Sequence, residues 1–242
     1  MVKCACITGG TKGIGRAVAD TLAAGGYNLV LTYASDNIAA KHTGMELWQR
    51  FGVEVHVVQA DIASEEAPDK LRNYLEEKNI ILDALIFNAG LTCRTPFTEM
   101  QREEWKRVFF ANVHFPVFLL QAVVGRLRAG ACVVFTGSRM ADLPHSVSLA
   151  YGVSKASVHS LVKNLVKFLQ PYGVRVNGVA PGFVDTEWQR AKPTEIRQNI
   201  EAKIAAERFC HPEEIGEIYR ILIENAYMNG EIVTIDGGYS YK

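Results

Sequence analysis

Tyr151 and Lys155 lie four residues apart in a segment with helical spacing, so both side chains would leave the same face of a helix. A lysine ammonium beside a tyrosine favours the phenolate, so we expect it to lower the pKa of the phenol from its ordinary value of about 10. Thirteen residues before Tyr151, Ser138 closes an apolar run over 131–137, and its hydroxyl could hydrogen-bond a carbonyl oxygen. These three side chains predict a proton-transfer site, provided that the fold brings them together.

The spacing alone is weak evidence, because the chain contains a second pair of the same type, Tyr74 and Lys78. Tyr74 falls late in a predicted helix, which places it at the edge of the sheet where strands begin, and no strand-end serine accompanies it. Tyr151 starts its helix just beyond the carboxyl end of a strand. Position therefore separates the two pairs where the motif cannot.

The elements that must position these residues alternate along the chain. Apolar runs predict strands over 2–8, 28–33, 53–60, 80–87, 131–137, 174–180 and 231–236. Helical patterns lie between them, over 14–25, 37–51, 65–78, 102–128, 152–170 and 212–226. This alternation predicts an α/β fold: a single Rossmann-type domain over 1–242, with a doubly wound parallel sheet of about seven strands in a three-layer αβα arrangement. We expect the polar, proline-containing segment 185–211 to form a flap over the site.

The first predicted strand ends in a glycine-rich turn, Thr8 to Gly15, that leads into a helix. Ligands of such sheets bind beyond the carboxyl ends of the strands. Glycines there let the backbone turn tightly and approach a pyrophosphate, and the helix N-terminus offers amides to the phosphates. The Gly-x-x-x-Gly-x-Gly spacing could also be an ordinary strand-to-helix turn, but its place on the first strand favours dinucleotide binding.

The end of the second strand distinguishes the two nicotinamide cofactors. NAD sites commonly place an acid there for the ribose hydroxyl, but the run 29–35 offers none until Asp36. Lys12 inside the glycine loop and Arg16 just past it suit a 2′-phosphate, so the sequence favours NADP(H). The alternative is that both are solvated charges at the start of a helix.

The composition limits the other functions. Twenty-six basic and 26 acidic residues leave no net charge, so no bulk field favours nucleic acid or a membrane surface. The five cysteines lack metal-ligand spacing, and no metal site is expected. The first residues are broken too early by glycine for a secretory signal, and no apolar run approaches the roughly 20 residues of a membrane span. We therefore expect a cytoplasmic protein.

Several polar residues have two interpretations. Asn112, in an apolar helical stretch, is either a buried amide bonded to the backbone or holds a water that serves the site. Asp61, at the end of the third strand, either accepts from an adenine amino group or caps the next helix. His145 could touch substrate, whereas we expect His114 and His159 to be packing or surface residues.

With these residues assembled, the chain resembles the short-chain dehydrogenase/reductase family over nearly its whole length. The shared features are Thr8 to Gly15, Asp61, Asn88-Ala89-Gly90, Asn112, Ser138, Tyr151-x-x-x-Lys155, and Pro181-Gly182 followed by Thr186. The resemblance implies Tyr151 as general acid, Lys155 on the nicotinamide ribose and tuning Tyr151, Ser138 on the substrate oxygen, Asn112 in a proton relay, and Thr186 on the nicotinamide amide. The cofactor site that it implies comprises Gly9, Thr11, Lys12, Gly13, Ile14, Gly15, Tyr33, Ser35, Asp61, Ile62, Asn88, Ala89, Gly90, Tyr151, Lys155, Pro181, Gly182, Val184 and Thr186. It further implies a homotetramer or a dimer built on the helices 102–128 and 152–170.

Within the family the nearest likeness is to the beta-ketoacyl-[acyl-carrier-protein] reductases of fatty acid biosynthesis, on 88–92, 179–186 and 235–239. Tyr172 stands where those enzymes usually have an arginine of the carrier-protein docking patch, whereas Arg126 and Arg128 remain. The likeness predicts an NADPH-dependent carbonyl reductase of a small-molecule or thioester ketone, with acyl carrier protein as a candidate partner. The alternatives are a dehydrogenase of a sugar, steroid or polyol hydroxyl, and a non-catalytic dinucleotide-binding sensor. The segments expected to contact the substrate, 92–98, 139–150 and 185–211, predict an apolar lining without a decisive charge.

Overall fold

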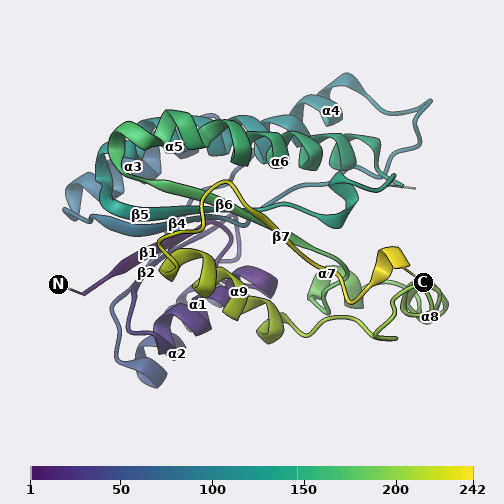
Figure 1. The fold of residues 1–242 in the computed structure, drawn as a ribbon, viewed down its shortest axis with the longest axis horizontal. Helices are drawn as coiled ribbons and strands as arrows, with labels where there is room; N and C mark the ends of the chain where they lie inside the picture. Colours follow the sequence, from purple (N-terminus) through teal and green to yellow (C-terminus); the bar gives the residue numbers. More distant parts are fainter. Residues whose placement is uncertain (1, 146, 242) are drawn as a thin grey trace.

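The computed structural model describes residues 2–145 and 147–241. The strands are β1 (Cys4–Ile7), β2 (Asn28–Tyr33), β3 (Val55–Gln59), β4 (Leu82–Phe87), β5 (Leu127–Thr136), β6 (Arg175–Pro181) and β7 (Ile232–Ile235). They form one seven-stranded sheet in the order β3-β2-β1-β4-β5-β6-β7, and every neighbouring pair is parallel (Figure 1). The prediction of a doubly wound, Rossmann-type parallel sheet is confirmed.

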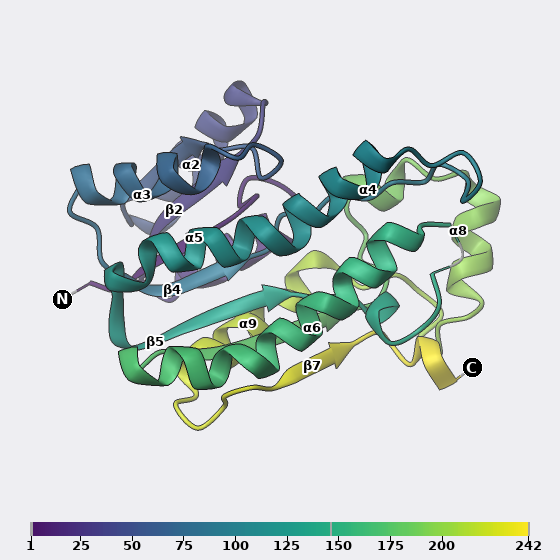
Figure 2. The same ribbon diagram turned by 90° about the horizontal axis from the view of Figure 1, so that it is seen from above.

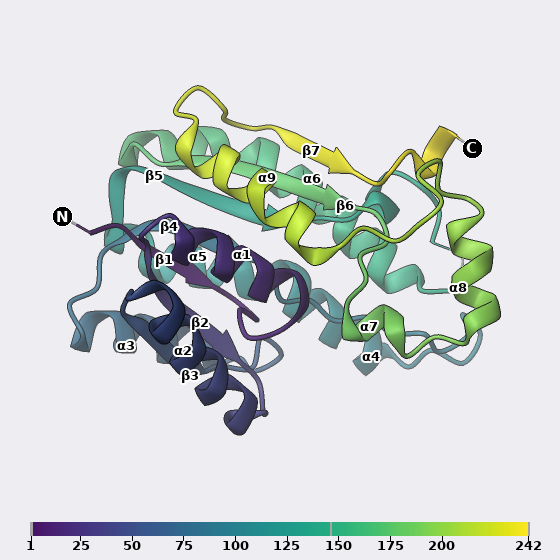
Figure 3. The ribbon, with the colours of Figure 1, turned by 90° about the horizontal axis from the view of Figure 1, so that it is seen from below.

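Helices cover both faces of this sheet. Figure 2 looks onto the layer formed by α3 (Ala67–Glu77), α4 (Arg102–Phe109), α5 (Phe115–Val123) and α6 (Leu149–Leu169). Figure 3 looks onto the opposite layer, formed by α1 (Gly13–Ala24), α2 (Asn37–Phe51) and α9 (Pro212–Glu224). Two short helices, α7 (Glu187–Arg190) and α8 (Thr194–Glu201), lie beyond the carboxyl ends of the strands.

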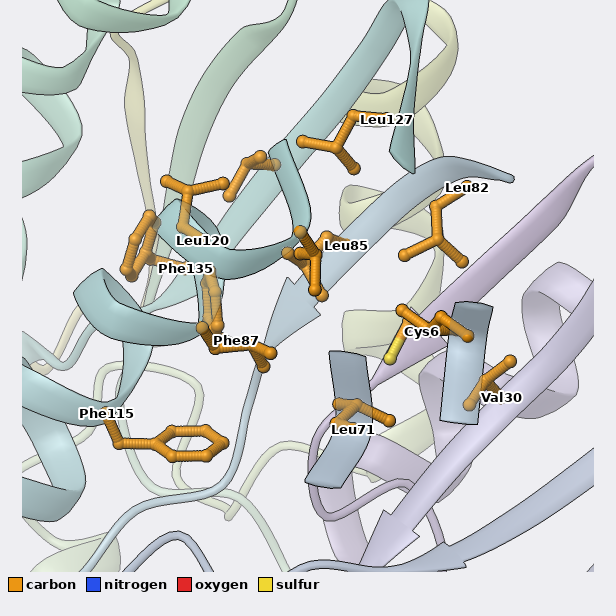
Figure 4. Close-up of a cluster of buried hydrophobic side chains, with 14 of the residues drawn as sticks. Cys6, Val30, Leu71, Leu82, Leu85, Phe87, Phe115, Leu120, Leu127 and Phe135 are labelled. Atoms are coloured by element: carbon orange, nitrogen blue, oxygen red, sulfur yellow. The ribbon is translucent and has the colours of Figure 1, made fainter. Parts of the chain in front are cut away.

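The strands are apolar on both faces because alternate residues enter two different cores. Cys6, Leu85 and Phe135 pack toward α3, α5 and α6 in the cluster drawn in Figure 4. Their neighbours Ile7 and Ile86 point the other way, into the cluster under α1, α2 and α9. Two buried cores fix the register of the sheet. Because all the strands are parallel, their carboxyl ends meet at one edge.

Three predicted boundaries were wrong. The helix expected over 102–128 is helical to Arg126, with a π-helical turn η1 (Phe110–His114) between α4 and α5 and a 3-10 turn η2 (Val124–Arg126) after α5. β5 begins at Leu127 instead of residue 131. Gly130 lies inside β5 with φ +90°, where the register against β4 shifts. The helix expected from 152 begins at Leu149, because the Ser148 hydroxyl caps it.

The continuous helical segment Arg102–Arg126 is long and apolar enough to cross a membrane, by length and composition alone. The expectation that no apolar run approaches that length was therefore wrong. In this fold Phe115, Leu119 and Val123 are buried in the core against the sheet. Its apolar composition is accounted for in part by this packing.

Candidate active site

A cavity of about 950 Å³ opens at the carboxyl edge of the sheet. Its walls come from the loops after β1, β4, β5 and β6, from the start of α6, and from α7 and α8. The structure brings these predicted site residues together in its lining: Gly9, Lys12, Gly13, Ile14, Asn88, Ala89, Gly90, Ser138, Tyr151, Lys155, Pro181, Gly182, Val184 and Thr186.

The glycine loop leaves the start of α1 open toward this cavity. Gly9 has φ +62°, in the left-handed region that glycine adopts without strain. A β-carbon at Gly15 would overlap the carbonyl oxygen of Gly9, so the close turn requires glycine there. α1 begins at Gly13 without a side-chain cap, which leaves its first amides as donors for an anion.

The end of β4 is bound directly to the glycine loop. The Asn88 amide nitrogen of the main chain donates to the Thr8 hydroxyl at 2.9 Å, and the Asn88 side chain donates to the Thr8 carbonyl at 3.0 Å. Ala89 also donates to the Thr8 hydroxyl, at 3.1 Å. Asn88 therefore positions the loop as well as lining the cavity.

The loop cation Lys12 has a partner that the sequence did not predict. Its Nζ lies 2.8 Å from the carboxylate of Asp36, and both side chains are about half exposed. The other Asp36 oxygen accepts from the Ala39 amide and caps α2. The hydrogen bond raises the pKa of Lys12 and lowers that of Asp36. A cation and an acid thus lie together where the second strand ends.

Tyr151 and Lys155 lie in the first two turns of α6. The Ser148 cap accepts from the Tyr151 amide, and Tyr151 lines the cavity. The buried Nζ of Lys155 donates to the Thr136 carbonyl at 2.7 Å and lies 5.7 Å from the centroid of the Tyr151 ring. Ser138, two residues after β5, forms a side-chain hydrogen bond with Tyr151. The predicted serine–tyrosine–lysine site therefore assembles.

The turn that carries Ser138 packs on His159, which lies one helical turn after Lys155. The Ser138 amide donates to Nε2 of His159 at 3.5 Å, and Nδ1 of His159 lies 3.3 Å from Asp142. A β-carbon at Gly137 would overlap the His159 ring. His159 is buried, as a packing residue would be, but it also positions this turn, which the sequence analysis missed.

Asn112 lies in the π-helical turn, behind Gly90, and does not line the cavity. Its Oδ1 accepts from the Leu91 amide at 2.8 Å, and its Nδ2 donates to the Leu91 carbonyl and to the Ser154 hydroxyl, both at 2.9 Å. These bonds agree with the first of its two interpretations, a buried amide bonded to the backbone, and a role in a proton relay stays a prediction. It ties the loop after β4 to the residue before Lys155.

The segment 185–211 forms a loop whose two ends are joined. The main-chain amide of Asp185 donates to the Cys210 carbonyl at 2.8 Å, and the main-chain amide of Cys210 donates to the Phe183 carbonyl at 2.9 Å. The loop contains α7 and α8, and both contribute to the cavity wall. Tyr239, near the carboxyl end of the chain, lines the same wall and packs on Phe183 with ring centroids 5.2 Å apart.

The model of a family described as enoyl-(acyl carrier protein) reductase matches residues 9–240. Solved short-chain dehydrogenase/reductases share the whole fold, including one from Burkholderia cenocepacia in complex with NADP (TM-score 0.92, 27% identity, 98% of each chain). The chain belongs to the short-chain dehydrogenase/reductase family.

Curated relatives of this short-chain dehydrogenase/reductase are similar over almost their whole length. The uncharacterized oxidoreductase YmfI of Bacillus subtilis is 32% identical, over 99% of both chains. A 3-oxoacyl-[acyl-carrier-protein] reductase of Aquifex aeolicus is 31% identical, over 98% of this chain and 96% of the relative. The chain is thus an oxidoreductase of the family, acting on alcohol or ketone groups.

Burial changes the proton affinities in this oxidoreductase site. Enclosure by the cavity wall raises the pKa of Tyr151, and the hydrogen bond with Ser138 only partly opposes that effect. Our expectation of a pKa of Tyr151 below its ordinary value was wrong, because burial outweighs the interactions that favour the phenolate. Burial also lowers the pKa of Lys155, to about 8. Tyr151 is therefore a neutral phenol at pH 7.

The remaining predicted cofactor residues lie outside the cavity wall: Thr11, Gly15, Tyr33, Ser35, Asp61 and Ile62. Asp61 is exposed, and its carboxylate accepts from the Ala63 amide at 2.9 Å in the turn before α3, whose N-cap is Glu66, so Asp61 does not cap that helix. The Tyr33 hydroxyl donates to Asn37 at 3.0 Å. Contacts from these residues to a nucleotide stay a prediction.

Proposed function

We propose that the chain is an NADPH-dependent carbonyl reductase that reduces the ketone of a 3-oxoacyl thioester or a similar small molecule. The observation that carries the proposal is the meeting of Ser138, Tyr151 and Lys155 at the cavity into which the glycine loop opens. The similarity to 3-oxoacyl-[acyl-carrier-protein] reductases supports the thioester, and with it a place in fatty acid biosynthesis.

Each side chain has a role that its surroundings support. The bound dinucleotide supplies the hydride. Tyr151 donates its phenolic proton to the carbonyl oxygen, and its raised pKa keeps that proton in place until transfer. Ser138 donates a hydrogen bond to the same oxygen and orients the ketone. Lys155 supplies a positive charge beside the phenol that favours the phenolate left after transfer.

The residues present fit a dinucleotide. The open amides at the start of α1 suit the pyrophosphate, and the close turn at Gly9 and Gly13 leaves room for it. Lys12 suits a 2′-phosphate, and the NADP complex of the Burkholderia cenocepacia structure supports the same cofactor. Asp36 competes for Lys12 in this structure.

Titration of NADPH and NADH tests the cofactor assignment. We expect the wild type to bind NADPH more tightly, Lys12→Glu to lose that preference, and Asp36→Ala to strengthen it. Equal wild-type affinity for the two cofactors would overturn the assignment. A wild-type preference for NADH that Asp36→Ala weakens would show that the acid, and not Lys12, selects the cofactor.

A panel assay that follows NADPH oxidation tests the substrate assignment. It compares acetoacetyl thioesters with diketones, sugars and steroids, and we expect the thioesters to give the highest kcat/KM. A preference for a sugar, steroid or polyol in the oxidative direction would replace the reductase proposal with the dehydrogenase alternative. Tight NADPH binding without turnover of any of them would favour the sensor.

Docking of acyl carrier protein at Arg126 and Arg128 has less support. Arg128 pairs with Asp83 at 2.7 Å at the start of β5, and Ser138 follows the other end of that strand. Eight residues of extended chain separate Arg128 from Thr136, about 26 Å at roughly 3.3 Å per residue. A carrier thioester reduced no faster than a free small ketone would remove this partner.

We also propose a homotetramer or dimer built on α5 and α6, in the cytoplasm. The support is that Phe118 on α5 and Phe168 on α6 are large apolar side chains left exposed. Light scattering of the purified protein tests the assembly, and a monomer at micromolar concentration would contradict it.

A further inference from the structure

We propose that Arg94 and Lys192 form a subsite that binds an anionic group, phosphate or carboxylate, carried by the ketone substrate. This inference rests on the proposed reductase function and deepens it by naming a feature of the substrate. It also replaces our expectation of a substrate wall without a decisive charge.

The two cations come from separate segments and line one cavity. Arg94 lies in the loop after β4, and Lys192 lies between α7 and α8. His145 lies in the same wall, with its ring centroid 5.5 Å from that of Tyr151. An anion at these cations would therefore be bound to the same cavity as the carbonyl at Tyr151.

Neither cation is neutralised by an acid of the described residues. Nζ of Lys192 donates to the neutral Gln189 side chain at 2.7 Å and lies 6.0 Å from the centroid of the Phe183 ring. Glu104 is an acid of α4 close in sequence to Arg94. Its carboxylate accepts hydrogen bonds from the Thr95 hydroxyl at 2.6 Å and from the Gln101 amide at 2.9 Å. Lys192 is partly buried and Arg94 is exposed at the cavity wall, so an anion entering the cavity would meet two cations that no acid of the described residues pairs with.

The small number of acidic side chains in the cavity wall also favours an anionic ligand. Within residues 2–145 and 147–241, the acidic side chain in the cavity wall is Glu187, and its charge acts on Lys12 at the glycine loop. Burial, with added repulsion from Arg94 and Arg197, lowers the pKa of Lys192. Burial and the charges of Lys192 and Arg94 likewise lower the pKa of His145. An anion bound here would relieve this repulsion.

The dinucleotide does not account for these two cations. Its phosphates are expected at the first turn of α1 and at Lys12, whereas Arg94 and Lys192 act on His145. The His145 Nδ1 accepts from the Val147 and Ser148 amides at 3.2 and 3.1 Å, so the proton lies on Nε2. Nε2 then adds a third donor to the same part of the wall.

Matched substrate pairs test the subsite. Acetoacetyl-coenzyme A is compared with acetoacetyl-N-acetylcysteamine for a phosphate, and acetoacetate with methyl acetoacetate for a carboxylate. The variants are Arg94→Gln, Lys192→Gln and the double variant, and Lys106→Gln on the exposed face of α4 is the control. Calorimetric binding of coenzyme A and acetoacetate to the NADP⁺ complex is measured in parallel, so that binding is read without turnover.

We expect kcat/KM for one anionic member to exceed that of its neutral partner by about tenfold or more, and to fall about tenfold for each cation removed. The neutral partner and the control should stay within about twofold. Anionic and neutral substrates used equally well, or a ratio that the variants leave unchanged, would overturn the subsite. If no substrate is turned over but the anions bind, and bind more weakly to the Arg94 and Lys192 variants, the reductase proposal is refuted and the subsite stands. If the anions do not bind at all, the subsite is refuted.

Discussion

Two tyrosine–lysine pairs with the same spacing have different surroundings in this molecule. Tyr151 lines the cavity, and Lys155 is buried with its ammonium on the Thr136 carbonyl. Tyr74 instead hydrogen-bonds His56 near the start of β3 at 2.8 Å, and the exposed Lys78 pairs with its neighbour Glu77. The comparison shows that the spacing places two side chains on one helix face, whereas the end of the sheet to which that face points decides whether they do chemistry.

Removing the two tyrosine hydroxyls gives the largest expected contrast. Tyr151→Phe should lower kcat about 10²–10⁴-fold, because the proton donor to the carbonyl is lost, and should leave NADPH binding nearly unchanged. Tyr74→Phe should keep kcat within about twofold. Steady-state kinetics checks both, and retained turnover in Tyr151→Phe would refute the general-acid assignment.

The two lysines differ in what their burial costs. Lys155→Met should raise the free energy of unfolding at pH 7 by about 1–3 kcal/mol, because it removes a buried ammonium, while activity falls. The gain should shrink as pH rises from about 8 toward 10.5, the window in which the unfolded chain binds more protons at Lys155 than the folded one.

Lys78→Met is the matched control, because Lys78 is about half exposed and its ion pair with Glu77 lies at the surface. Its free energy of unfolding should change by less than about 0.5 kcal/mol. Urea unfolding of both variants across this pH range measures the difference, and equal effects would show that Lys155 carries no burial cost.

The Tyr74–Lys78 pair should contribute to stability and not to turnover. Tyr74→Phe removes the hydrogen bond to the partly buried His56 and should cost about 0.5–1.5 kcal/mol of unfolding free energy. Denaturant melts measure it. A loss of activity without a loss of stability would mean that Tyr74 has a functional role after all.

The smallest expected effect concerns the histidine under the Ser138 turn. Burial lowers the pKa of His159 below its ordinary 6.5, although Asp142 opposes this. Below pH 6.5 the unfolded chain therefore binds the extra proton first, and stability should fall as pH decreases. In His159→Gln this fall should be shallower, as read from melting temperatures between pH 5 and 7.5; an identical pH profile would contradict the pKa shift.

The strands, the helices and the glycine loop could be predicted because each is encoded locally. Apolar runs bury both faces of a parallel sheet, and Gly9 and Gly15 meet conformational needs that few other residues satisfy. The start of β5 at Leu127 was not predicted, because the register shift near Gly130 depends on how β5 pairs with β4.

What escaped prediction are contacts between side chains distant in sequence. The Lys12–Asp36 pair, the His159–Asp142 pair and the position of Lys192 in the cavity each depend on how two separate segments fold over the sheet edge. The polarity of a residue does not reveal which segment it will face. The pKa of Tyr151 escaped for the same reason, since burial outweighs its neighbour in sequence.

The position of Tyr239 has a practical consequence for anyone who prepares this protein. Tyr239 lines the cavity against Phe183, and Gly238 leaves so little space that a β-carbon there would lie 2.8 Å from that of Ala205. A substitution that displaces Tyr239 would therefore move part of the cavity wall and should alter the measured KM, so this short stretch is best left unchanged in any variant. Figure 1 shows it close to α7 and α8, beyond the carboxyl ends of the strands.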